Sequence, residues 1–89
     1  MTPTVIAIDG IFDTHAASIL RKQLTGMAPA EPILLDFSRA RDVYDFALAV
    51  IAHGLASDGI TARYRGLMHH QERMLHYLGF DAEHGACDR

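Results

Sequence analysis

Residues 34–51, LLDFSRARDVYDFALAVI, decide how this chain folds. The run 34–37 is short and apolar apart from Asp36, as in a buried strand, and Ser38 begins a polar stretch that predicts a turn. From Asp45 to Ser57 the sequence is almost continuously apolar, which predicts a deeply buried helix interrupted mainly by His53. A strand, a turn and a helix in this order are typical of an α/β fold.

Similar patterns extend in both directions from this unit. Alternating and β-branched residues predict strands over 4–8, 33–37 and 60–66, and Ile11 and Phe12 can continue the first strand beyond the turn formers Asp9-Gly10. A spacing of 3.6 residues predicts an amphipathic first helix that begins at Asp13 or Thr14. Its predicted apolar stripe is Ala16, Ala17, Ile19, Leu20, Leu24 and Met27. The stripe of the third helix is Met68, Gln71, Leu75 and Leu78, with Gly79 as its C-terminal cap.

Length and composition indicate one small globular domain over residues 1–82, followed by a flexible tail over 83–89. The chain has 89 residues, of which 49% are hydrophobic and 21% charged. Its net charge of −3 and scattered basic residues disfavour direct nucleic-acid binding. The single cysteine, Cys87, excludes an intrachain disulfide and fits a reducing compartment. No apolar run reaches the roughly 20 residues that span a bilayer, so we expect a cytoplasmic protein without direct membrane insertion.

The order and spacing of several short motifs resemble the STAS domain family, the fold of bacterial anti-sigma factor antagonists. The matching segments are Gly10 to Asp13, Leu35-Asp36-Phe37-Ser38, Gly66-Leu67, and Leu75 to Phe80. The resemblance implies a single STAS-like α/β domain with a small mixed β-sheet and helices packed mainly on one face. It also implies a role in signalling and transcription regulation through protein–protein interaction.

The residues that carry phosphoregulation in this family are altered here. The family pattern Asp-Ser-Ser-Gly-Leu aligns with Tyr44-Asp45-Phe46-Ala47-Leu48, so Phe46 stands where relatives have the phosphorylated serine. Phenylalanine cannot accept a phosphoryl group. The resemblance therefore implies partner binding without serine phosphorylation at the usual site, and Ser38 is expected to be a structural turn residue.

Asp13, Tyr44, Asp45 and Phe46 are the candidate partner-binding residues. Asp45 is expected to cap the helix, and an additional role as a permanent negative charge that imitates phosphorylation stays open. Asp13 is likewise a candidate cap that would lie near this surface in a STAS domain. Phe46 fits both core packing and, together with Tyr44, an aromatic docking patch.

The histidines and the cysteine do not form a recognisable catalytic or metal-binding pattern. His69 and His70 face directions about 100° apart on a helix, and His69 and His76 lack the i, i+4 spacing that chelates best, even if His84 folds back. His53 is expected to be an interface or core histidine. Cys87 lies in the tail, away from a rigid base. We therefore expect no enzymatic activity, no metal and no cofactor.

Two functions are consistent with these residues. The first is a non-catalytic module that binds an anti-sigma factor or a regulatory kinase. The alternative is a small STAS subunit of a bacterial lipid-transport ABC system that contacts its ATPase. The sequence also leaves a homodimer open.

Overall fold

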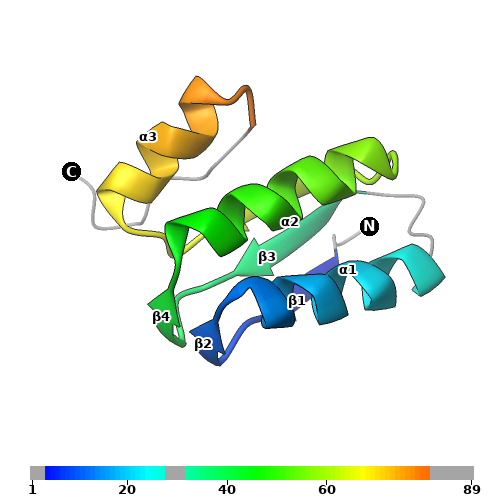
Figure 1. Cartoon of the computed structure of the whole chain (residues 1–89), viewed down its shortest axis with the longest axis horizontal. Coiled ribbons are helices and arrows are strands. Elements are labelled where there is room, and N and C mark those ends of the chain that lie inside the picture. The colour runs from blue at the N-terminus through cyan, green and yellow to red at the C-terminus, as the bar shows by residue number, and fades with distance from the viewer. Residues whose placement is uncertain (1–3, 28–31, 81–89) are drawn as a thin grey trace.

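The computed structural model describes residues 4–27 and 32–80, which form an α/β domain of strands and helices (Figure 1). This confirms the predicted fold class. The predicted tail with His84 and Cys87 lies outside the described residues. In chain order the elements are β1 (Thr4–Ala7), β2 (Gly10–Phe12), α1 (Thr14–Met27), β3 (Ile33–Asp36), β4 (Ala40–Val43), α2 (Asp45–Ser57), β5 (Ala62–Arg65) and α3 (His69–Tyr77).

All strand pairs among the described residues are parallel. β3 lies between β1 and β5 in a three-stranded sheet, and β2 pairs with β4 beyond the end of that sheet. The mixed sheet implied by the family resemblance is therefore not seen in this part of the chain. The reason is connectivity: α1 and α2 each carry the chain back across the sheet, so the next strand starts from the same end.

The two faces of the sheet differ in character. Leu35 on β3 is aligned with Ile6 on β1 and Tyr64 on β5, and this row belongs to the hydrophobic core beneath the helices. The neighbouring row, which contains Leu34 and Arg63, points to the opposite face because side chains alternate along a strand. Figure 1 shows α1 and α2 side by side across one face, with α3 beyond α2, in line with the helix packing that the family resemblance implies.

The helix predictions are right in extent and partly wrong in orientation. α2 has the predicted bounds and is the most buried helix, with six buried residues. On α1, Leu20 and Leu24 are buried as predicted, whereas Ile19 and Met27 are exposed. On α3, Gln71 and Leu75 are buried. Met68 and Leu78 are the N-cap and C-cap residues of this helix, and both are exposed, contrary to the predicted stripe.

A glycine fixes the connection between β5 and α3. Gly66 has φ 81°, in the left-handed region that favours glycine, and any Cβ there would collide with the backbone of Phe37 and Ser38. The predicted sharp exit at Gly66 is confirmed. At the other end of α3 the cap residue is Leu78 and not Gly79 as predicted. Gly79 follows the cap with φ 93°, and Phe80 donates its backbone N–H to the Leu75 carbonyl at 2.8 Å and packs against the core.

None of the helices in the described part of the chain is long and apolar enough to cross a lipid bilayer.

Candidate functional site

The end of the β2–β4 pair brings the two predicted binding segments together. Phe12 is aligned with Val43, and the backbone N–H of Tyr44 donates to the Phe12 carbonyl at 3.1 Å. Asp13 follows Phe12 directly, so it lies beside Tyr44. At this point the segments after β2 and β4 leave their strands and enter α1 and α2. We define Asp13, Tyr44, Asp45 and Phe46 as the α2 N-terminal surface.

Asp13 is the N-terminal cap of α1. Its Oδ1 accepts a hydrogen bond from the backbone N–H of Ala16 at 2.9 Å, as a capping carboxylate does. The side chain is half-buried. The capping prediction is confirmed, and the position of Asp13 close to the start of α2 agrees with the sequence-based expectation.

Asp45 does not cap α2, so that prediction is wrong. The cap position belongs to Tyr44, whose backbone is extended (φ −81°, ψ 134°) and whose side chain makes no capping bond. Asp45 is the first helical residue. Its carboxylate turns toward α3, where Oδ1 accepts a hydrogen bond from Gln71 Nε2 at 2.9 Å and lies 3.2 Å from His70 Nε2.

These contacts favour the ionised form of Asp45. The hydrogen bond from Gln71 has the largest effect and lowers the pKa of the carboxyl. Desolvation opposes it, and the hydrogen bond and charge interaction with His70 lower the pKa further. The carboxylate side chain is nevertheless 54% exposed. It is therefore a charged group that is fixed in position and open to solvent.

Gln71 supports this arrangement and was missed as a functional residue by sequence reasoning. It is only 2% exposed, and besides Asp45 its Nε2 reaches the Val43 carbonyl at 2.8 Å. Its Oε1 accepts the backbone N–H of Met68 at 3.2 Å. One buried amide thus joins α3, β4 and α2. The available signal was a polar residue within an otherwise apolar helical stripe.

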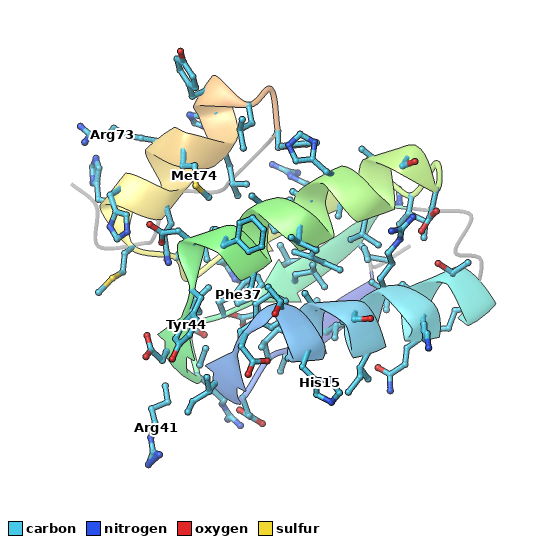
Figure 2. All side chains as sticks on the ribbon, viewed as in Figure 1. His15, Phe37, Arg41, Tyr44, Arg73 and Met74 are labelled. Atoms are coloured by element: carbon cyan, nitrogen blue, oxygen red, sulfur yellow. The ribbon has the colours of Figure 1, made fainter. Side chains whose placement is uncertain are left out.

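Phe46 is exposed, which rules out the core-packing alternative. Its side chain is 72% exposed, and that of Tyr44 is 50% exposed. The buried face of α2 is occupied instead by Ala47, Leu48 and Ile51. Figure 2 shows Tyr44 at the start of α2, at the edge of the molecule rather than in its interior. Two aromatic side chains therefore flank a fixed carboxylate, an arrangement suited to contact with apolar or cationic groups of a partner.

Ser38 and His53 have other contacts in the domain. The Ser38 hydroxyl donates to Asp36 Oδ1 at 2.6 Å in the turn after β3, which confirms its predicted turn role. His53 is exposed on α2 rather than buried in the core, and its ring meets that of Phe80 edge to face at 5.2 Å. Within residues 4–27 and 32–80, no group of three or more histidine, cysteine or acidic side chains is arranged to hold a metal ion.

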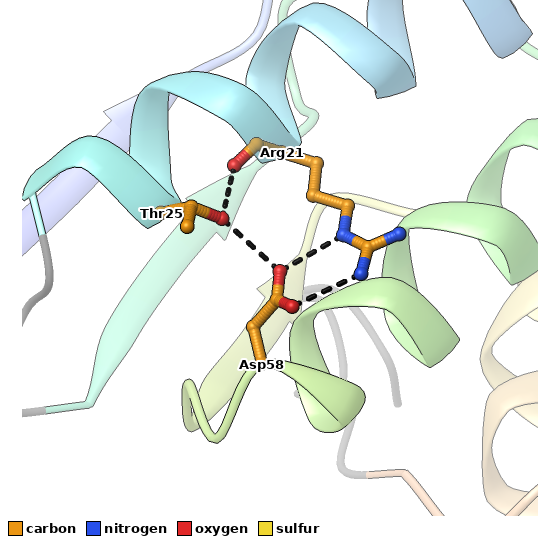
Figure 3. Close-up of polar contacts among 3 residues, drawn as sticks. All are labelled: Arg21, Thr25 and Asp58. Carbon is orange, nitrogen blue, oxygen red and sulfur yellow. Dashed lines mark hydrogen bonds and ion pairs between the residues drawn. The ribbon is translucent and has the colours of Figure 1, made fainter.

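A polar cluster at the other end of α2 joins this helix to α1 (Figure 3). Arg21 donates to both oxygens of Asp58 at 2.8 and 3.0 Å, and Thr25 donates to Asp58 at 3.0 Å. The arginine side chain crosses Gly54, where a Cβ would lie 2.8 Å from Arg21 Cδ. Sequence reasoning treated Arg21 as an ordinary solvated residue, because its partner is 37 positions away.

No model of a known protein family matches this chain, and a search of curated proteins finds no match either.

Proposed function

We propose that this chain is a non-catalytic STAS-like interaction module of the bacterial cytoplasm. It binds an anti-sigma factor or a regulatory kinase through the α2 N-terminal surface. Because Phe46 stands at the position of the usual phosphorylated serine, the module acts by competing for its partner and not by reversible phosphorylation at that position.

The observation that carries this proposal is the exposure of Phe46 at 72%, beside the half-exposed ring of Tyr44. Large aromatic side chains dominate the binding energy of many protein interfaces, and burying one that is exposed in the free protein favours association. The same helix buries its opposite face almost completely, so the domain does not need the Phe46 ring for its core.

The hydrogen bonds that fix Asp45, between the two aromatic residues, also favour a binding role. Asp45 is bonded to Gln71 and His70 on α3, and Gln71 is in turn bonded to the β4 backbone. A surface that is ordered before binding loses less conformational entropy when a partner docks. The fixed negative charge of Asp45 further favours a partner with a basic or hydrogen-bond-donating contact residue.

A pull-down from a lysate of the source cell tests the proposal. The bait proteins are the wild type, Phe46→Ala, Asp45→Ala and the matched control Tyr77→Ala, which removes an exposed aromatic ring from the end of α3. Circular dichroism verifies that each bait is folded. An anti-sigma factor or kinase retained by Tyr77→Ala and lost by Phe46→Ala supports the proposal. Capture of a transporter ATPase with the same pattern supports the lipid-transport alternative, and capture that is insensitive to Phe46 and Asp45 contradicts both.

A further inference from the structure

The two outer strands of the three-stranded sheet differ in how their edges are protected. β5 carries Arg63 and Arg65, and charged side chains are a common means of preventing an edge strand from pairing with another chain. On the opposite edge, residues 4–8 have the sequence TVIAI, which contains no charge, proline or glycine. In the described residues β1 has a neighbouring strand, β3, on one side only.

The backbone groups on the free edge of β1 can be assigned from its pairing with β3. The N–H of Ile8 donates to the Asp36 carbonyl at 2.9 Å, so Ile8 directs its backbone groups toward β3. Backbone direction alternates along a strand, and Ile6 therefore also faces β3, whereas Val5 and Ala7 direct their N–H and C=O groups outward. An extended backbone is the chemical complement of such a row of donors and acceptors.

Apolar side chains lie beside this free edge. A groove of about 270 Å³ runs between β1–β2 and α1 and is lined mainly by Ile6, Ile8, Ile11, Ala16, Ile19 and Leu20. Val5 and Ile11 are each 51% exposed and Ile19 is 46% exposed. In Figure 1, β1 lies behind α1, and residues of both elements line this groove.

We propose that a second copy of this chain pairs with β1 through its own β1, antiparallel and around a two-fold axis at Ile6. This contact is separate from the α2 N-terminal surface. In that register the backbone N–H and C=O of Val5 in each copy bond the backbone C=O and N–H of Ala7 in the other copy. All outward backbone groups of Val5 and Ala7 in both copies are then hydrogen-bonded. The two Ile6 side chains face one another on the helix side of a continuous six-stranded sheet.

The charge distribution favours this occupant. The paired segments are uncharged, and the antiparallel register places the Asp9 carboxylates of the two copies at opposite ends of the joined strands, so they do not repel one another at close range. The exposed Ile11 and Ile19 lie along the groove that borders the pair. A two-fold contact of this kind uses the same surface on both copies and closes after two subunits.

Sedimentation velocity over a wide range of protein concentration tests the proposal. The wild type is expected to show a monomer–dimer equilibrium. Ala7→Pro removes an outward N–H while leaving the β1–β3 hydrogen bonds intact, since proline is tolerated on the open side of an edge strand. It removes one hydrogen bond per subunit and should weaken the dimer by about tenfold or more. Ala62→Pro makes the matched change on the outer edge of β5 and should leave the dimer unchanged.

Val5→Lys is a second variant that keeps all backbone donors. It tests the β1–β1 contact if Ala7→Pro fails to fold. It brings two ammonium groups onto one face of the joined sheet and should also weaken the dimer. A wild type that stays monomeric at the highest concentration overturns the proposal. A dimer that persists unchanged in folded Ala7→Pro and Val5→Lys also overturns it, as does a dimer lost in Ala62→Pro alone.

Discussion

Gln71 Nε2 lies 2.9 Å from Asp45 Oδ1, and this contact ties α3 to the first residue of α2. The amide is buried, and the same nitrogen also bonds the Val43 carbonyl. Through it, a residue of the closing helix determines where the carboxylate of the candidate binding surface points.

Replacing Gln71 with leucine should destabilise the domain by about 1–3 kcal/mol, because the part-buried hydrogen bonds of this buried amide to the backbone of Val43 and Met68 are lost. Urea unfolding measures this change. Gln23→Leu, at an exposed position of α1, is the matched control and should stay within about 0.5 kcal/mol of the wild type. Equal effects of the two substitutions would show that the buried amide is not structurally important.

Asp45 should contribute to the pH dependence of folding. Its pKa is lowered in the folded protein, so its stabilising contribution is present above the ordinary aspartate pKa and is lost as the pH falls through the lowered value. Below about pH 4, stability should therefore fall less steeply in Asp45→Asn than in the wild type. Some slope should remain, because hydrogen bonds from Ser38 and Arg21 likewise lower the pKa values of Asp36 and Asp58. Identical slopes in urea titrations at several pH values would contradict the proposed contacts.

Phe46 and Phe37 should respond to truncation in opposite ways. Phe37 is buried and packs edge to face against Phe12 at 5.1 Å, so Phe37→Ala should cost about 3–5 kcal/mol of unfolding free energy. Phe46→Ala should change stability by no more than about 0.5 kcal/mol, because its ring is exposed. Denaturant titrations of both variants make the comparison. A large loss of stability in Phe46→Ala would show that this ring packs in the core and is not available to a partner.

Gly54 and Arg21 should be energetically coupled. Alanine is a better helix former than glycine by about 1 kcal/mol, but a Cβ at position 54 would displace the Arg21 side chain that bonds Asp58. Gly54→Ala should therefore stabilise the protein by up to about 1 kcal/mol in an Arg21→Ala background and by less in the wild type. A double-mutant cycle measures the difference. Identical effects of Gly54→Ala in both backgrounds would mean that Arg21 does not lie across this glycine.

Local sequence patterns predicted the elements well, because their determinants lie within each segment. The bounds of α2 follow from its apolar run and from Asp58-Gly59 after it, and the turn at Ser38 follows from its polar neighbours. The direction of strand pairing could not be read in this way, since it depends on how helices return the chain. The exposure of Phe46 could not be predicted either, because the sequence of a helix that is apolar on nearly all sides does not indicate which side faces the core.

The errors at Asp45 and Gln71 have a common cause. A helix cap depends on a single-residue offset, and here Tyr44 occupies the cap position while Asp45 is already helical. The carboxylate is then available to α3, a contact across 26 positions of sequence that no local pattern encodes. Asp13, whose capping partner Ala16 is only three residues away, was predicted correctly.

Hydrogen–deuterium exchange of the chain, alone and in complex with the protein that it captures, shows whether a partner docks on the α2 N-terminal surface. We expect backbone amides of residues 44–48 to exchange more slowly in the complex, while those at the end of α1, around residues 24–27, are unchanged. Protection that leaves residues 44–48 unaffected and appears elsewhere would show that the α2 N-terminal surface is not where the partner binds.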